Sequence, residues 1–128
     1  MKTVGEVMTK ALLELAEATP LAEAATAMTE RRVGSALVVD GERLVGIITE
    51  RDVLRAVGSG GVDGTVGDWM TRQPETVDAD ESTQQAGVVM IHGGFRHLPV
   101  LDGGKPVGIV SIRDLMRVVL EDVSPRGV

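Results

Sequence analysis

The chain has 128 residues, of which 43% are hydrophobic and only 2% aromatic, with 19 acidic residues, 13 basic residues and no cysteine. A net charge of −6 argues against a sequence-independent grip on nucleic acid, and the lack of cysteine excludes disulfides and thiolate chemistry. No apolar run approaches the roughly 20 residues that span a bilayer, and Glu6 stands where a signal peptide would be apolar, so we expect a soluble cytoplasmic protein without membrane contact.

The first predicted elements are short helical turns at 4–9 (VGEVMT) and 66–71 (VGDWMT). Brief extended pieces follow them, around 13–15 and 76–77. A helix is then predicted from about Pro20 to Arg32, because Leu21, Ala24, Ala25 and Met28 recur at helical spacing and proline suits a first turn. Its counterpart is expected from about Glu81 to His92.

Two β-rich runs come next, at 35–39 and 43–49, and Asp40-Gly41 between them predicts a hairpin turn. These runs are apolar almost throughout, so we expect their strands to be covered on both faces. A second helix, with Val53, Leu54 and Val57 on one side, closes a unit of the order β-α-β-β-α.

This unit is present twice. GIITERD at Gly46–Asp52 returns as GIVSIRD at Gly108–Asp114, a shift of 62 positions that holds without insertion along the unit. The division expected from this register is repeat 1 at 1–57, a glycine-rich flexible linker at 58–64, repeat 2 at 65–122 and a frayed C-terminal tail at 123–128. One copy alone buries too little surface. We therefore expect an α/β fold with two small sheets flanked by helices, the copies being related by a pseudo-twofold with two equivalent clefts between them.

The repeated signature combines three chemical features. Thr49 and Ser111 stand where a strand ends and a helix begins, and a helix N-terminus attracts anions such as phosphate. Asp52 and Asp114, three residues later, can accept two hydrogen bonds from a vicinal diol such as that of ribose. A glycine three residues before the hydroxyl, Gly46 in the first copy, would let a flat base approach the strand.

The same spacing is also close to a helix capping box, in which hydroxyl and acid satisfy backbone N–H groups. Duplication does not choose between the two interpretations, because both caps would be inherited together. Arg51 and Arg113 are equally ambiguous, since arginines in a first helical turn are usually solvated.

The order of these pieces resembles a pair of cystathionine-β-synthase (CBS) domains, the Bateman module. The resemblance rests on VMT and WMT before each unit and on FRHLPVLDGGKPVGIVSIRD in the second, and it covers Thr3 to about Leu120. It implies a regulatory module, with energy sensing among its roles, that binds AMP, ADP, ATP, S-adenosylmethionine or a similar adenosyl ligand in one or both clefts. No obligatory cofactor is implied.

Carried onto this sequence, the resemblance assigns ribose to Asp52 and Asp114, and ribose or phosphate to Thr49 and Ser111. Arg96 and His97 would reach phosphates at the Asp52 site, whereas the Asp114 site would face the neutral Gly34-Ser35, so the two sites should be unequal. The full set of implied ligand-binding residues is Thr49, Asp52, Ser111, Asp114, Arg96, His97, Ile47, Ile109, Ser35 and Thr76, of which the isoleucines line the base and Thr76 borders it.

The histidines also allow interpretations other than phosphate binding. His97 also fits a structural histidine at a strand start. His92 and His97, five residues apart with Gly-Gly between them, have poor metal-ligand spacing, and no metal site is expected.

The function expected is therefore a stand-alone ligand-sensing module that modulates an unknown protein partner. The alternative is a ligand-free structural or dimerisation protein. Catalysis is the weakest hypothesis, because the sequence has no cysteine, no tyrosine, no P-loop and no recognisable nucleophile–base pair. We expect a homodimer, head-to-head or head-to-tail. The short helices at 4–9 and 66–71, called the lead-in helices, and the helices that close each unit carry more apolar residues than a monomer can hide. These include Val4, Val7, Met8, Trp69, Met70, Leu115, Met116, Val119 and Leu120.

Overall fold

The computed structural model describes residues 2–10 and 12–121, so the tail predicted at 123–128 lies outside the described residues. The chain folds as two compact units. One is Leu12–Pro74, called here the 12–74 unit. The other combines the described residues of Met1–Ala11 with those of Glu75–Val128 and is called the 75–121 unit. Each compact unit thus takes its lead-in helix from the other sequence repeat.

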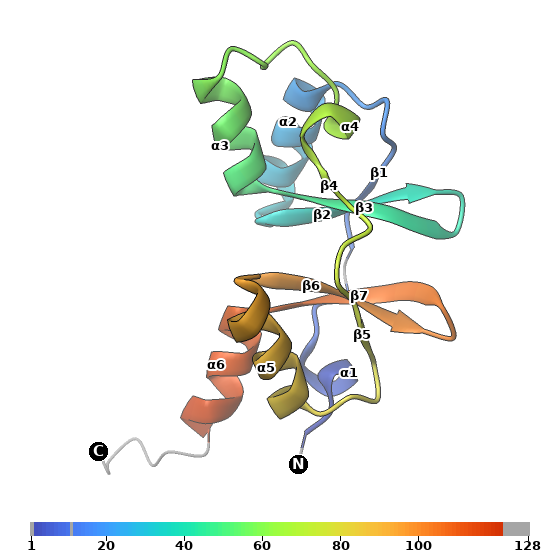
Figure 1. Ribbon diagram of the computed structural model, residues 1–128, viewed down its shortest axis with the longest axis vertical. Coiled ribbons are helices and arrows are strands. Elements are labelled where there is room, and N and C mark those ends of the chain that lie inside the picture. Colours follow the sequence, from blue (N-terminus) through green and yellow to red (C-terminus); the bar gives the residue numbers. More distant parts are fainter. Residues whose placement is uncertain (1, 11, 122–128) are drawn as a thin grey trace. The chain divides into compact units, whose positions relative to one another are not determined.

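The 12–74 unit is a four-stranded sheet with helices packed on it (Figure 1). Its strands lie in the order β1-β2-β3-β4, with β1 parallel to β2 and the other pairs antiparallel. Its elements are β1 (Glu14–Leu15), α2 (Leu21–Arg31), β2 (Ser35–Asp40), β3 (Arg43–Thr49), α3 (Glu50–Gly58), α4 (Val66–Trp69) and β4 (Thr71–Arg72).

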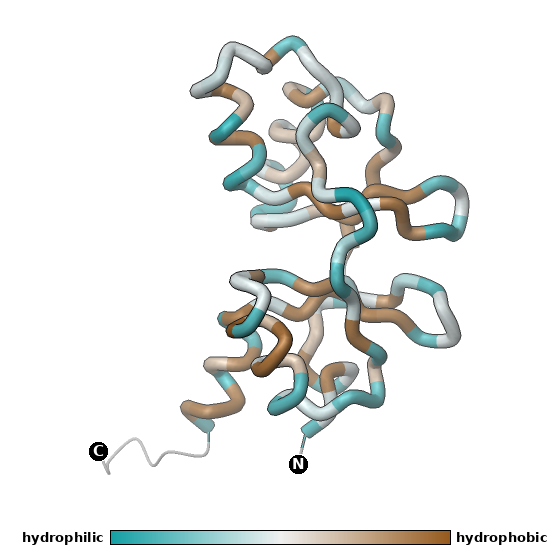
Figure 2. The backbone as a smooth tube through the Cα atoms, in the orientation of Figure 1, coloured by the Kyte–Doolittle hydropathy of each residue, from teal (hydrophilic) through white to brown (hydrophobic). Residues whose placement is uncertain are grey.

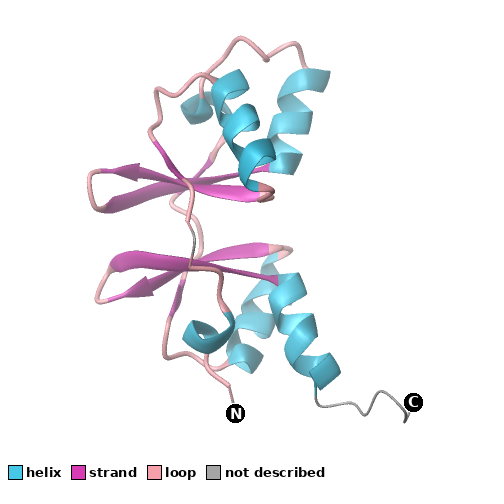
Figure 3. Cartoon of the chain, turned by 180° about the vertical axis from the view of Figure 1, so that it is seen from behind, coloured by secondary structure: helices cyan, strands magenta, loops and turns pink. Residues whose placement is uncertain are grey.

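The 75–121 unit repeats this plan with three strands in the order β5-β6-β7, and Figure 3 shows its helices on one face of that sheet. Again the first pair is parallel and the second antiparallel. Its elements are α1 (Val4–Val7), β5 (Val77–Asp78), α5 (Thr83–Gly93), β6 (His97–Asp102), β7 (Lys105–Ser111) and α6 (Ile112–Glu121). The predicted fold class, an α/β chain with two small sheets flanked by helices, is confirmed.

Local chemistry explains where the long helices begin and end. Ser82 caps α5 by accepting the Gln85 N–H, and Gly94 ends that helix in the left-handed conformation at φ 73°. Pro20 precedes the first turn of α2, as its fixed φ favours, and Arg32 ends it at φ 56° without the help of a glycine. Both helices therefore lie within two residues of their predicted bounds.

Two local predictions were wrong in their bounds. The predicted hairpin is present, but its turn is Gly41–Glu42 and not Asp40-Gly41, because Asp40 still pairs with Arg43 and Gly41 takes the positive φ of 64°. The helical turn predicted through residue 71 ends at Trp69, and Thr71–Arg72 pairs with β3 as the short edge strand β4. A strand of two residues is too short to show the alternating hydrophobic pattern from which strands are predicted.

Each sheet sends alternate side chains to opposite faces. In the 12–74 unit, Ala36, Val38 and Ile48 enter the core formed with the helices, which includes Leu21, Ala24 and Met28. The same alternation in the 75–121 unit gives Leu98, Val100 and Val110 to a core with Ala86 and Met90. Figure 2 shows the strands of both sheets as largely hydrophobic segments.

The lead-in helices complete these cores. Val66 of α4 is fully buried in the core of the 12–74 unit, and Val4 of α1 is fully buried in that of the 75–121 unit. Arg72 of β4 also makes two ion-pair contacts with Glu17, at 3.1 and 3.2 Å. These contacts, and not sequence order, decide the membership of each unit.

In the stretch 58–64, predicted as a flexible linker, Gly58 ends α3 and residues 59–64 form a loop that makes defined contacts. The Gly61 N–H donates to the Ala56 carbonyl, and the Gly64 carbonyl accepts the Leu21 N–H at 2.9 Å. A Cβ on Gly61 would overlap the Trp69 ring, so the loop packs closely on that indole. Glycine at position 61 permits this close approach.

Candidate functional site

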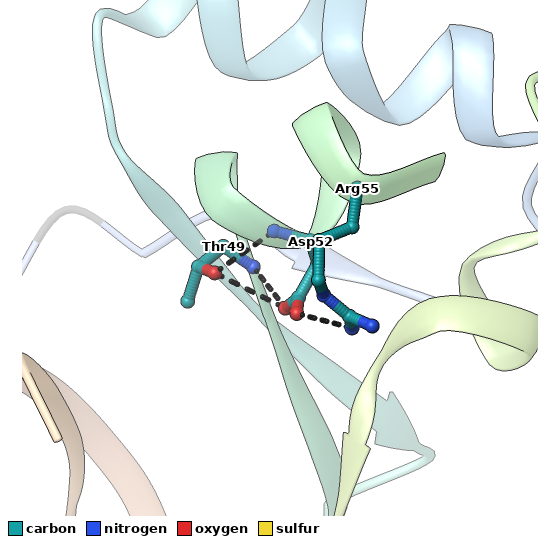
Figure 4. Close-up of polar contacts among 3 residues, drawn as sticks. All are labelled: Thr49, Asp52 and Arg55. Carbon is teal, nitrogen blue, oxygen red and sulfur yellow. Dashed lines mark hydrogen bonds and ion pairs between the residues drawn. The ribbon is translucent and has the colours of Figure 1, made fainter. Parts of the chain in front are cut away.

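The first candidate site is built on one turn at the start of α3 (Figure 4). The Thr49 N–H donates to Asp52 Oδ2 at 2.9 Å, and the Thr49 hydroxyl donates to the same oxygen at 3.1 Å. In return the Asp52 N–H donates to Thr49 Oγ1 at 3.4 Å. The Arg55 guanidinium Nη2 donates to the other carboxylate oxygen, Oδ1, at 3.0 Å. Asp52 is 7% exposed, so its charge is held among these partners rather than by bulk water.

The second candidate site repeats this arrangement at the start of α6. The Ser111 N–H donates to Asp114 Oδ2 at 2.8 Å, and the Asp114 N–H donates to Ser111 Oγ at 3.1 Å. Arg117 Nη1 lies 3.4 Å from Asp114 Oδ1, a longer contact than that of Arg55. Asp114 is 6% exposed. Two separate stretches of sequence thus fold into the same local geometry.

The capping interpretation describes contacts that are present: both hydroxyl–acid pairs satisfy backbone N–H groups at a helix start. Capping does not use all the hydrogen-bond acceptor positions of these carboxylates, because an ionised carboxylate offers about four. Asp52 uses three of them within the chain and Asp114 uses two. Each acid can therefore accept a further hydroxyl donor while it caps its helix.

Strand register brings the predicted site residues of the 12–74 unit onto one face of its sheet. Ser35 lies opposite Thr49, and Ile47 lies opposite Leu37, two residues further along each strand. Residues directly opposite in an antiparallel pair share a face, and this face is the one away from the core of Ala36 and Ile48. Ser35 and Ile47 are both buried at 6% exposure.

The same face exists in the 75–121 unit. His97 lies opposite Ser111, and Ile109 lies opposite Pro99. His97 is half-buried, and Ile109 is buried. His97 is therefore the cross-strand neighbour of Ser111, whose hydroxyl belongs to the second candidate site. It is also the first residue of β6, the position that its interpretation as a structural histidine expects.

The other two predicted residues are less tightly placed. The Arg96 side chain is exposed, and its carbonyl accepts the Ile112 N–H at 2.9 Å, which fixes the backbone at the start of α6. Thr76 is half-buried and directly precedes β5. Arg96 and His97 belong to the 75–121 unit and Asp52 to the 12–74 unit. Their expected partnership stays a prediction.

The role expected for Gly46 is wrong. A Cβ at this position would lie 2.8 Å from Met70 Sδ and 2.8 Å from the Thr71 carbonyl oxygen. At Gly108 it would overlap Met8. The side of the strand left open by each glycine is thus filled by the chain's own lead-in segment, and no base can approach there.

Three residues of the site were missed by sequence reasoning. Arg55 and Arg117 each follow the acid by three positions, the helical spacing at which opposite charges meet, and that spacing could have identified them. Trp69 stacks on Arg55, with the guanidinium carbon 5.6 Å from the ring centroid. No sequence signal links residues 55 and 69, because the contact depends on where α4 packs.

A groove of about 570 Å³ lies elsewhere, between α5 and α6 of the 75–121 unit. Its lining is mainly apolar and includes Gly87, Ile91, Ile112, Met116 and Val119. Within residues 2–10 and 12–121, no three His, Asp or Glu side chains are grouped as metal ligands would be. None of the helices described there has the length and hydropathy to cross a membrane.

Comparison with known families identifies both repeats. The sequence model of the CBS domain matches residues 4–59 and again residues 66–121. An uncharacterized 17.7 kDa protein of Acidianus ambivalens is 45% identical over 103 residues, which is 79% of this chain and 63% of that protein. The chain thus spans less than two thirds of that relative's length.

Solved structures of similar fold have been determined with bound ligands. The crystal structure of the Arabidopsis thaliana protein CBSX2 in complex with AMP is 28% identical with a TM-score of 0.80, covering 95% of this chain and 98% of that one. The CBS domain pair of protein MJ0100, in complex with 5′-methylthioadenosine and S-adenosyl-L-methionine, is 26% identical with a TM-score of 0.90. That match covers 96% of this chain and 99% of the other.

Proposed function

The chain belongs to the CBS domain family as a tandem pair, and from this premise we propose that it is a regulatory module that binds an adenosyl ligand. The observation that carries the proposal is the pair of buried carboxylates, each fixed at a helix start with acceptor positions left for ribose hydroxyls, about one on Asp52 and about two on Asp114. Similar CBS pairs have been crystallised with AMP and with S-adenosyl-L-methionine. All these ligands contain an adenosyl ribose, and ribose presents two adjacent hydroxyl donors.

In the proposed complex Asp52 and Asp114 accept these hydroxyls, and Thr49 and Ser111 hold ribose or phosphate at the helix starts. Ile47 and Ile109 offer apolar surface to the base from the same sheet faces. Arg96 and His97 are proposed phosphate partners, and Ser35 and Thr76 border the sites. The role is regulatory and not catalytic: ligand occupancy alters how the module engages a protein partner in the cytoplasm.

Substitution of the two acids by asparagine tests this proposal. Asp52→Asn and Asp114→Asn keep a capping acceptor, so the stability of the fold should change little. Loss of the charge should weaken ligand binding at the altered site about tenfold or more, given roughly 1.5–3 kcal/mol for a hydrogen bond to a charged group. Isothermal titration with AMP, ATP and S-adenosylmethionine measures the loss, and the phosphate-bearing ligands report on Arg96 and His97.

Asp40→Asn is the matched control. It makes the same change of charge on the exposed hairpin, where Asp40 lies 3.8 Å from Arg43, and should leave binding as in the wild type. Wild-type binding that both site variants retain in full would disprove the ribose role. A wild type that binds none of the three ligands would favour the alternative of a ligand-free dimerisation protein.

We also propose that the module is a homodimer in which the α5–α6 groove contacts the same groove of a second copy. Ile91, Met116 and Val119 are 76%, 48% and 54% exposed, a concentration of apolar surface uncommon on monomers. The corresponding helices of the 12–74 unit carry Thr29 and Glu50 where the groove has Ile91 and Ile112. Leu54 and Val57, which are 72% and 58% exposed, occupy the positions of Met116 and Val119, so both faces carry exposed apolar residues. The face of the 75–121 unit is proposed as the self-complementary contact because it adds Ile91 and Ile112 to them.

A further inference from the structure

The first candidate site contains a support that the second lacks. Arg55 lies one turn beyond Asp52 on α3, and its guanidinium donates to Asp52 Oδ1 at 3.0 Å while its carbon lies 5.6 Å from the Trp69 ring centroid. The position that corresponds to Trp69 in the other repeat is Val7. Arg117 therefore meets Asp114, at 3.4 Å, without an aromatic neighbour at that position.

We propose that Arg55 is a positioning residue of the Asp52 site, held by Trp69, that orients the Asp52 carboxylate for a ribose diol. This inference rests on the proposed function and adds to it a residue that distinguishes the two sites. The Arg55–Asp52–Trp69 group is called the Arg55 relay below.

The need for a cation follows from burial. The Asp52 side chain is 10% exposed, and a buried carboxylate is costly unless a positive charge and hydrogen bonds compensate it. Thr49 satisfies Oδ2, so Oδ1 is the oxygen with room for a ligand hydroxyl, and Oδ1 is the atom that Arg55 contacts. Arg55 thereby sets both the charge balance and the direction of the accepting atom.

Arg55 needs the Trp69 indole because its own side chain is exposed. The Arg55 side chain is 56% exposed, and a long exposed side chain samples many rotamers, which weakens a surface ion pair. Stacking on an aromatic face restricts the guanidinium and adds an attraction of its own. Trp69 is fixed in turn, because Gly61 packs against its ring and a Cβ on Gly64 would lie 3.3 Å from Nε1. The loop 61–64 thus supports the indole, the indole supports Arg55, and Arg55 supports the acid.

Adenosine is the first probe because it has the diol and lacks phosphate. Arg55→Ala should weaken adenosine binding at the Asp52 site about three- to fivefold, the size expected when an ion pair of this exposure is lost. AMP should lose affinity by the same factor, because Arg55 acts through Asp52. In an Asp52→Asn background the Arg55→Ala change should have no further effect, as a double-mutant cycle would show.

The tryptophan supplies a second readout. Trp69 is the only tryptophan in the chain, and a cation that moves against its ring changes the indole emission. Adenosine should therefore alter the fluorescence of the wild type and of Asp114→Asn, and leave that of Asp52→Asn unchanged. Trp69→Phe keeps a ring beneath Arg55 and should retain adenosine affinity, whereas Trp69→Leu should lose it as Arg55→Ala does. Thermal unfolding of each variant shows that it is folded.

Arg43→Ala is the matched control, since it also removes one arginine and one exposed ion pair, at a distance from the Arg55 relay. The inference is overturned if Arg55→Ala binds adenosine as the wild type does. It is also overturned if only AMP is weakened, because Arg55 would then contact phosphate directly, or if the loss persists in the Asp52→Asn background. A wild type that binds neither adenosine nor AMP refutes the proposed function itself, and the inference with it.

Discussion

At the scale of single residues, the structure assigns the signature glycines to packing. Gly46 has Met70 Sδ and the Thr71 carbonyl oxygen within 2.8 Å of where a Cβ would stand. One of these neighbours is backbone and cannot move without shifting β4. The glycine is therefore required by the lead-in segment and not by a ligand.

Gly46→Ala should destabilise the fold by about 1–3 kcal/mol, the range for overpacking a close-packed core. Gly58→Ala is the matched control: a Cβ there meets nothing within 4 Å, and alanine at the end of α3 should be neutral or slightly stabilising. Urea unfolding measures both. Equal stability of Gly46→Ala and the wild type would show that Met70 yields freely and that the glycine has another role.

At the scale of elements, each lead-in helix packs in the core formed by the other repeat. Val4 of α1 lies in the core with Val77 and Val110, and Val66 of α4 lies in the core with Leu21 and Ile48. Backbone hydrogen bonds agree, since Gly5 donates to the Ala79 carbonyl and Gly67 donates to that of Glu17. Truncation of one lead-in helix should therefore weaken the repeat that is distant in sequence.

Val4→Ala should remove about 2 kcal/mol of stability, the order expected for a deleted pair of buried methyl groups, and lower hydrogen-exchange protection first in β5–β7. Val66→Ala should do so in β1–β3. Each variant serves as the other's control, because the substitution and the burial are the same. Loss of protection in the repeat adjacent in sequence would contradict the assignment of the lead-in helices.

At the scale of the whole molecule, the prediction concerns self-association through the α5–α6 groove. Ile91 is 76% exposed, so aspartate at this position should leave the monomer's fold intact and disrupt an apolar contact between copies. Light scattering at micromolar concentration should give a dimer for the wild type and a monomer for Ile91→Asp. Val62→Asp, at an exposed apolar residue outside the groove, should remain dimeric. A monomeric wild type, or a dimeric Ile91→Asp, would rule out this interface.

The sequence by itself determined the repeat, the long helices and strands, the fold class and the CBS family, because these follow from patterns that are local or that recur at a fixed shift. It also predicted the contacts between hydroxyl and acid at the starts of α3 and α6, since the two residues of each pair lie within one helical turn. Only the tertiary structure decided which core receives each lead-in helix, that Met70 fills the space at Gly46, and that Trp69 holds Arg55. These contacts join residues that are far apart in sequence or on different elements. They depend on how the elements pack together, and such packing produces no local or periodic pattern in the sequence.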